Sequence, residues 1–427
     1  MSTPRTVSVF PILLVNFIGT FGFSLVLPFL VFLVLDFGGN ELIYGLVGAV
    51  YSGFQFIGAP ILGRWSDKYG RRIILLLSQG GTFLAWCLFV VALLVPHISW
   101  FEVEGSFLGD FSLTLPLVIL VVARALDGLT GGNISVAQAY MADITDEENR
   151  KKNYGQLAAS TNLGFMLGPA LAGLLGATVL GELLPVSLAL VISLVAMLLI
   201  YFRLPESKPC VPNWSFSLRT KFKAFGQDKE CFETEGENNR LGFSAALRLP
   251  NVGLMISLYF LIFLAFNFFY VGFPIYAVKS LDWSTVQLGI FFTLISSLTI
   301  LVEGPILTRL AKRFAESTLI VVGGILLTVN FVLIVLGGEY GIWIAALFFA
   351  CGNGLMWPSF LALLASVAGT KHQGAIQGYA SSGGSLASVI GLVAGGFLYG
   401  LIGTSSFLIA AALMGIIVLI VGGSFRK

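Results

Sequence analysis

Long apolar runs, separated by short polar segments, follow one another along the whole chain. A helix needs about 20 apolar residues to cross roughly 30 Å of hydrocarbon. Twelve runs are long enough, over residues 8–35, 43–63, 73–95, 113–141, 154–180, 184–203, 251–278, 286–308, 317–337, 340–368, 373–400 and 404–423. The pattern therefore predicts an all-α, polytopic membrane protein with twelve transmembrane helices.

The longest polar stretch divides these predicted helices into two groups of six. It covers residues 205–250 and includes a run rich in Asp, Glu and Lys. A polar segment of this length is typical of a linker between domains. We therefore expect an N-terminal six-helix bundle over 1–204, a cytoplasmic linker over 205–250 and a C-terminal six-helix bundle over 251–427.

The two groups of helices also resemble each other in sequence. Residues 60–64, PILGR, end the second run, and residues 305–309, PILTR, end the eighth. Three glycines of the fifth run match three of the eleventh at a constant spacing of 223: Gly155, Gly168 and Gly173 with Gly378, Gly391 and Gly396. An internal repeat with two pseudo-symmetric bundles is typical of transporters. Chance similarity in Gly-rich apolar sequence is the alternative.

Composition and charge place the chain in lipid and exclude a nucleic-acid partner. The chain is 57% hydrophobic and 11% charged, whereas a soluble domain is about 45–50% apolar and about 25% charged. The net charge of +2 is too small to indicate binding to nucleic acid. The expected surroundings are the lipid bilayer.

The distribution of Lys and Arg predicts the orientation. If both termini lie on one side, that side receives 22 of the 24 basic residues, with Lys279 opposite and Arg124 inside the membrane. By the positive-inside rule, both termini are cytoplasmic. The compact size favours the cell (inner) membrane of a bacterium. We expect the transporter to work as a monomer.

No arrangement in the chain indicates an enzyme, a metal site or a cofactor. The four cysteines show no CxxC or Cys/His spacing, and both histidines, His97 and His372, lie near loops. The predicted spans hold no Ser/His, paired-Asp or HExxH arrangement. We therefore expect no catalytic residues, no metal and no cofactor.

Two charged residues lie inside the fourth run. Arg124 is about eleven residues from its outer end, near the middle of the membrane, where Arg costs at least ~2.5–3.5 kcal/mol. Asp127 follows three residues later, on the same helical face, so the two side chains can pair. An intramembrane ion pair indicates a functional site, and a structural pair that holds this helix to a neighbour is the alternative.

Two further patterns stand out. The loop between the second and third runs, residues 63–72, reads GRWSDKYGRR, with one carboxylate, Asp67, among four cations. Its alternative explanation is an ordinary positive-inside loop. The fifth run reads GFMLGPALAG over residues 164–173. Glycines four apart let helices approach closely, and Pro169 removes a backbone hydrogen bond.

These patterns resemble signatures of the major facilitator superfamily. Residues 63–72 are similar to its loop signature G-x-L-a-D-r-x-G-R-k, and Arg124 with Gly128 to its R-x-x-x-G element. Residues 164–173 are similar to the G-x-x-x-G-P-x-x-G-G element of its proton-driven exporters, with Ala172 in place of one glycine. Residues 140–145 and 204–207 also look like the twelve-helix drug/proton antiporter branch, particularly the tetracycline-efflux type.

The resemblance implies roles for these residues. It implies conformational switching for Gly63, Asp67, Gly70, Arg71 and Arg72, proton coupling around Arg124, and helix packing for Gly164, Gly168, Pro169 and Gly173. Members of that branch often carry an acid in the first span, where this chain has Asn16. If a proton is coupled, Asp127 must then carry it, together with Glu303. Glu303 lies near the cytoplasmic end of the eighth run, where it could instead snorkel to the interface.

The fold of that family places the first, fourth, seventh and tenth spans around a central cavity. Polar and aromatic residues at mid-depth of these spans are the expected substrate-binding set: Asn16, Asn133, Asn267, Tyr270, Asn353 and Trp357. Rings with a few hydrogen-bonding groups suit a small amphipathic organic molecule. Lipid contact is the alternative explanation for the phenylalanines of residues 266–270, FNFFY.

These observations favour a secondary active transporter that exports small amphipathic organic compounds in exchange for protons by alternating access. The runner-up keeps the fold but lacks proton coupling, as a facilitator or a flippase for a lipid-like substrate, and Asn16 favours it. A membrane receptor or scaffold that does not transport is the third possibility, against which the duplicated halves argue.

Overall fold

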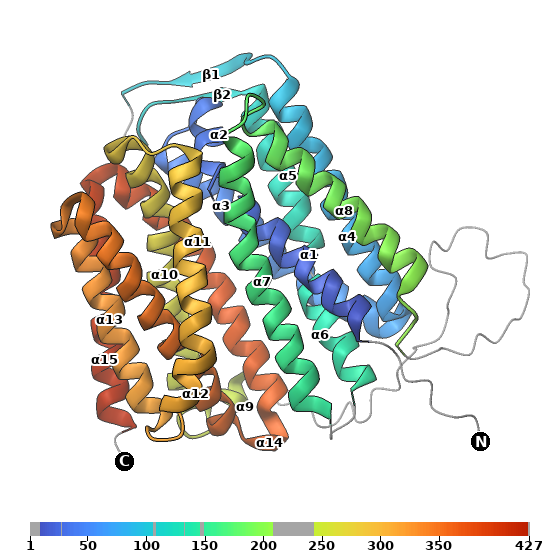
Figure 1. The fold of residues 1–427 in the computed structure, drawn as a ribbon, viewed down its shortest axis with the longest axis vertical. Helices are drawn as coiled ribbons and strands as arrows, with labels where there is room; N and C mark the ends of the chain where they lie inside the picture. The colour runs from blue at the N-terminus through green and yellow to red at the C-terminus, as the bar shows by residue number, and fades with distance from the viewer. Residues whose placement is uncertain are drawn as a thin grey trace, which may run out of the picture.

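The computed structural model describes residues 9–26, 28–105, 108–131, 133–145, 149–207 and 243–425. Helices packed side by side make up almost all of it, and a short β-hairpin covers one end (Figure 1). The first helix begins and the last helix ends at the opposite end of the bundle. The structure has the all-α, polytopic membrane architecture that the sequence predicts.

The first half of the chain contains eight helices and the hairpin. They are α1 (Phe10–Val26), α2 (Leu30–Asp36), α3 (Glu41–Tyr69), α4 (Arg71–Leu94), β1 (Ser99–Val103), β2 (Phe111–Thr114), α5 (Leu115–Thr130), α6 (Asn133–Ile144), α7 (Arg150–Gly176) and α8 (Leu183–Arg203). α1 and α2 meet at a bend of 44°. The predicted fourth span, residues 113–141, is divided between α5 and α6.

The second half contains the remaining helices. They are α9 (Phe243–Leu247), α10 (Val252–Leu281), α11 (Thr285–Leu301), the π-helical turn η3 (Val302–Ile306), α12 (Leu307–Leu310), α13 (Glu316–Leu336), α14 (Gly338–Ile402), the 3₁₀ turn η4 (Gly403–Ser405) and α15 (Ser406–Ser424). α14 covers the tenth and eleventh predicted spans, with non-helical backbone at Gly369 (φ +66°) between them. Residues 208–242, most of the predicted linker, lie outside the described residues.

The number of spans depends on how these breaks are counted. Within the described ranges, nine helices are long and apolar enough to cross a membrane, or ten if α1 and α2 form one bent span. By this measure α5 and α6 are each too short, and residues 376–424 count once although Gly403 (φ +57°) interrupts them. The predicted number of twelve is therefore not reached by length and composition alone.

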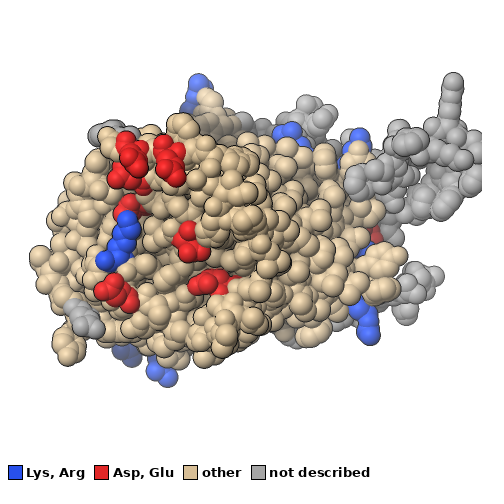
Figure 2. Space-filling model, turned by 90° about the horizontal axis from the view of Figure 1, so that it is seen from above, with Lys and Arg blue, Asp and Glu red and all other residues tan. Residues whose placement is uncertain are grey.

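The segment between the third and fourth predicted spans forms a two-stranded antiparallel sheet. β1 pairs with β2, with Glu102 opposite Ser112, and the Thr114 side chain then caps α5 by accepting a hydrogen bond from the Leu117 amide at 3.4 Å. Figure 2 looks onto this end of the molecule, where acidic side chains outnumber basic ones. This acidic end is the one that the charge distribution predicts to face away from the cytoplasm.

Apolar side chains cover the outside of the bundle as well as its interior. Leu419 on α15 is 76% exposed, and Leu94 on α4 is 67% exposed. Soluble proteins rarely leave large continuous apolar areas exposed. The helical surface therefore requires lipid, in agreement with an integral, multi-pass membrane protein.

The largest contacts between the two halves are made by two pairs of helices. α3 packs against α14, and α7 packs against α11. A Cβ atom at Gly45 would lie 2.3 Å from the Leu392 carbonyl oxygen, and one at Gly289 would lie 2.7 Å from the Gly173 Cα. Glycine at these points lets the backbones of the two halves touch. Both contacts lie in the part of the bundle nearer the hairpin.

Candidate functional site

An arginine and an aspartate lie together on α5, away from solvent. Arg124 Nη1 and Asp127 Oδ2 are 3.7 Å apart, and only 6% and 15% of their side chains are exposed. The spacing of three residues places both on one face of the helix. Since 3.7 Å is too long for a hydrogen bond, the two are held as an ion pair without a direct hydrogen bond.

Side chains of α3 and α4 complete the surroundings of this pair. The guanidinium carbon of Arg124 lies 4.7 Å from the centre of the Tyr51 ring, a cation–π arrangement. Gln55 donates a hydrogen bond of 3.3 Å to the Tyr51 hydroxyl. The Thr82 side chain on α4 lies beside Asp127. The sequence motifs include neither Tyr51, Gln55 nor Thr82, because these residues meet α5 only through tertiary packing.

Gly128 explains how α3 comes so close to α5. A Cβ atom at this position would lie 2.3 Å from the Tyr51 carbonyl oxygen. Any larger residue would push α3 away and move the Tyr51 ring off Arg124. The glycine four residues after Arg124 therefore has a packing role in the site.

The guanidinium of Arg124 is incompletely satisfied. Its Nε and Nη1 are buried and have no hydrogen-bond partner among the residues that the structure describes. A buried donor without a partner costs about 1–3 kcal/mol. Arg124 is thus held by charge and by an aromatic face, an arrangement that a change in the charge of Asp127 would alter.

Glu303, the second predicted proton carrier, lies in the other half of the molecule. It belongs to the π turn η3, and its Oε2 accepts a hydrogen bond of 3.0 Å from Nδ2 of Asn162 on α7. In the described ranges no hydrogen bond or ion pair joins Glu303 to Arg124 or Asp127. The predicted proton-coupling residues therefore form two separate places and not one cluster.

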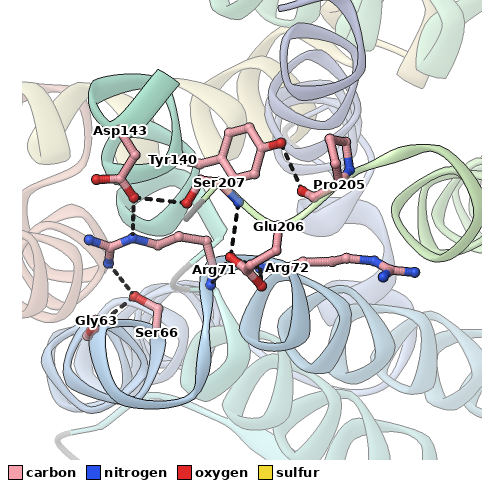
Figure 3. A network of polar contacts seen from close by, with 9 residues as sticks. All are labelled: Gly63, Ser66, Arg71, Arg72, Tyr140, Asp143, Pro205, Glu206 and Ser207. Atoms are coloured by element: carbon pink, nitrogen blue, oxygen red, sulfur yellow. Dashed lines mark hydrogen bonds and ion pairs between the residues drawn. The ribbon is translucent and has the colours of Figure 1, made fainter. Parts of the chain in front are cut away.

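The residues of the loop signature meet at the end of the bundle opposite the hairpin (Figure 3). Arg71 Nε donates to Asp143 Oδ2 at 3.0 Å, and its Nη1 donates to Ser66 Oγ at 2.7 Å. Ser207 Oγ donates to the same Asp143 oxygen at 2.9 Å. The network ties the end of α3 and the start of α4 to α6 and to the segment after α8. The side chain of Asp67 lies outside the described residues.

A carboxylate caps the start of α4 in this network. Glu206 Oε1 accepts from the Arg71 amide at 2.8 Å, and Oε2 accepts from the Arg72 amide at 3.2 Å. The φ of +100° at Gly70 strains any other residue there, and a Cβ atom would also lie 2.6 Å from Glu206 Oε2. Negative charge at a helix N-terminus is stabilising. In the sequence, residues 204–207 show only a resemblance to the exporter branch. The contact of Glu206 with the start of α4 was not predicted.

Burial raises the pKa of the Glu206 carboxyl above its usual 4.5, although hydrogen bonds from Arg71, Arg72 and Ser207 oppose the shift. The folded protein therefore holds this proton more tightly than the unfolded chain. The associated stability is present below pH 4.5 and is lost as pH rises through the raised pKa. We expect Glu206→Gln to remove this fall in thermal stability between acidic and neutral pH. If the melting temperatures of wild type and Glu206→Gln changed equally with pH, this assignment would be wrong.

The glycines of the predicted packing element lie at two helix contacts. Cβ atoms at Gly164 and Gly168 would lie 2.3 Å from Thr20 Oγ1 and 2.0 Å from Ser24 Oγ on α1. Gly173 touches α11 at Gly289, and Pro169 lies within the continuous helix α7. One face of α7 thus packs against its own half and the end of the helix packs against the other half.

Two of the predicted substrate-binding asparagines form hydrogen bonds between helices. Asn16 Nδ2 donates to Ser160 Oγ and Thr161 Oγ1 on α7, both at 2.8 Å. Asn267 Nδ2 donates to Ser388 Oγ on α14 at 3.1 Å. Both side chains therefore have partners inside the protein. Asn133 begins α6, and its side chain lies outside the described residues.

The predicted aromatic residues belong to two ring clusters of the second half. Tyr270 contacts Phe266, Phe269 and Phe349, and Trp357 contacts Tyr259, Phe263 and Phe360. Tyr270, Trp357 and Asn353 are each half-buried. Polar and charged groups thus gather on α3, α4 and α5 of the first half, and aromatic faces gather on α10 and α14 of the second.

Known proteins are similar to this chain in sequence, and solved structures are similar to it in fold. The tetracycline resistance protein, class E, of Escherichia coli is 27% identical over 391 residues, which cover 91% of this chain and 86% of that protein. Multidrug resistance protein 2 of Bacillus subtilis (strain 168) is 25% identical and covers 95% of this chain and 92% of its own. The crystal structure of a D-xylose-proton symporter matches with a TM-score of 0.71 at 16% identity, over 98% of both chains.

A second solved structure, the human organic anion transporter MFSD10 (TETRAN), matches with a TM-score of 0.66 at 22% identity, over 98% of this chain and 100% of that one. The helical bundle and its relatives define the chain as a membrane transporter. The family model of the Major Facilitator Superfamily matches residues 12–381. The chain belongs to that superfamily.

Proposed function

We propose that this transporter exports small amphipathic organic compounds in exchange for protons, by alternating access between two halves. The buried Arg124–Asp127 pair is the observation that carries the proposal. An ionisable pair inside a membrane protein is expensive to maintain and is usually functional. The names of the relatives, tetracycline and multidrug resistance proteins, support the export of organic compounds.

Protonation of Asp127 would remove the negative charge that faces Arg124. The guanidinium then loses its ion pair and keeps the Tyr51 ring, so the packing of α5 against α3 and α4 changes in energy. A ligand shifts a conformational equilibrium by its different affinity for the two states, and here the proton is that ligand.

We further propose that both termini are cytoplasmic, that the membrane is the bacterial cell membrane, and that residues 1–204 and 251–427 are the two moving bundles.

The substrate would contact both halves. The aromatic faces of Tyr270 and Trp357 provide the apolar side, while the groups around Arg124 provide the polar side. An amphipathic molecule fits such a division, because ring faces bind apolar or cationic parts and a few polar groups fix orientation. Asn16, Asn133, Asn267 and Asn353 complete the proposed set.

Transport into proteoliposomes tests the proposal. With tetracycline as the probe and an imposed pH gradient, we expect accumulation that collapses when a protonophore removes the gradient. Inverting the gradient should invert the direction of net transport. Accumulation that ignores the gradient in both directions would refute proton coupling.

A proton-independent facilitator or lipid-like substrate flippase is the second candidate. Asn16 favours this candidate, because the exporter branch often has an acidic residue in the first span where this chain has Asn16. The Asn16 amide donates hydrogen bonds to Ser160 and Thr161. Such a protein would exchange substrate on both sides of the liposome without a gradient. This exchange, with no accumulation, is its distinguishing result.

A further inference from the structure

A carboxylate on one half of the molecule is bound by an amide on the other half. Glu303, in η3, accepts a hydrogen bond of 3.0 Å from Asn162, near the middle of α7. Both side chains are half-buried. The carboxylate therefore does not simply extend to the interface, the alternative that its sequence position left open, but joins two helices that belong to different halves.

The backbone around Glu303 departs from the α-helix. η3 is a π turn between α11 and α12, and it includes Pro305, which has no amide hydrogen to donate. π turns within helices are frequent at functional sites. One turn before Glu303, the Thr299 hydroxyl is buried without a hydrogen-bond partner among the described residues. η3 and the last turn of α11 thus contain a carboxylate and an unsatisfied polar group.

No counter-ion neutralises this carboxylate in the described part of the chain. η3 packs against α11, α12 and α14, and α7 supplies Asn162. The basic side chains that follow on its own span, Arg309, Lys312 and Arg313, form no ion pair with it. α14 meets Val302 through Gly354, and the titratable residue of that stretch is Cys351. α7 carries Tyr154 and, at its start, Arg150, Lys151 and Lys152, whose side chains lie outside the described residues. Among the described side chains, Glu303 is therefore paired with a neutral amide.

The span that contains η3, residues 285–310, contacts α7 at a second point. Gly173 of α7 and Gly289 of α11 touch through their backbones. Asn162 precedes Gly173 by eleven residues, about 16 Å along the helix. A rocking motion about the glycine contact would separate α7 from η3 at the level of Asn162 and expose Glu303 to water.

We propose that Asn162 and Glu303 form a proton-controlled clasp between the two halves, closed when Glu303 is protonated and released when it ionises. Removing water from a carboxylate costs more than one hydrogen bond from an amide returns. Ionisation therefore favours the separated, hydrated state, and protonation favours the packed state. The clasp rests on the proposed alternating access, but it makes a prediction that needs no substrate.

Distance measurements between spin labels test the clasp. Ala158 on α7 and Thr308 on α12 are exposed and flank the contact, so cysteines are placed there in the full chain after replacement of its four native cysteines. We expect the distance between the labels to lengthen from acidic to alkaline buffer. Glu303→Gln should keep the short distance throughout, and Asn162→Ala should increase the long-distance population at acidic pH. Glu316→Gln, an exposed acid at the start of α13, is the matched control and should respond like wild type.

Three outcomes would overturn the proposal: a wild-type distance independent of pH, a Glu303→Gln variant that responds like wild type, or an Asn162→Ala variant that is indistinguishable from wild type. Asp127→Asn should keep the response at this label pair. Loss of the response in Asp127→Asn, with retention in Glu303→Gln, would assign it to Asp127 instead. Because the labels report conformation without transport, failure of gradient-driven export in proteoliposomes would leave this result standing and remain distinguishable from it.

Discussion

Asp127→Asn is expected to abolish accumulation driven by a pH gradient while leaving exchange of substrate across the membrane. Asparagine has nearly the shape of aspartate, but it cannot release a proton. The imposed gradient then has no group on α5 through which to act. Uptake in proteoliposomes is measured with the gradient and, for exchange, with labelled substrate on one side and unlabelled substrate on the other.

The control for this variant is an exposed acidic residue at the end of α2. Asp36 ends α2 and is exposed, so Asp36→Asn removes one carboxylate without touching the Arg124 site and should transport like wild type. If Asp127→Asn accumulated substrate as wild type does, proton coupling would lie elsewhere. If it lost exchange as well, Asp127 would be needed for the conformational change itself or for binding, and the assignment to coupling would be wrong.

The helical fold could be predicted from the sequence because hydrocarbon leaves few ways to satisfy backbone polar groups. Long apolar runs therefore indicate α4, α8 and α13 with small errors at the ends. The division of the fourth span into α5 and α6 falls at residues 130–133, TGGN, which the length criterion for a span included within one run. The apolar runs predict no strands between the third and fourth spans, because the pairing of β1 with β2 depends on contacts between residues 99–103 and 111–114.

The candidate site was predictable only where its residues are neighbours in sequence. The spacing of Arg124 and Asp127 predicts an ion pair on one helical face, and the structure contains it. Tyr51 reaches Arg124 from α3, more than seventy residues earlier, and Asn162 reaches Glu303 across the two halves. No local pattern encodes such contacts. The roles predicted for these residues in coupling and binding await the experiments described above.

Arg124→Gln is expected to lower the stability of the protein by about 3–5 kcal/mol, the usual consequence of removing one partner of a buried ion pair. Asp127 would remain buried beside the neutral Thr82 and without its counter-ion. The loss appears as a lower melting temperature of the purified protein in detergent. Arg309→Gln, which removes an exposed arginine on α12, is the matched control and should shift the melting temperature little.

The double variant Arg124→Gln with Asp127→Asn separates charge from packing. Both side chains are then neutral, and most of the stability lost in Arg124→Gln should return, since replacing a whole buried ion pair is far less costly than breaking it. The double variant should nevertheless lack gradient-driven accumulation, because it carries no proton at this site. A double variant as unstable as Arg124→Gln would mean that the contact of the guanidinium with Tyr51, and not its charge pairing with Asp127, holds α5 in place. Stability restored without coupling would instead show that the pair is retained for transport and not for the strength of the fold.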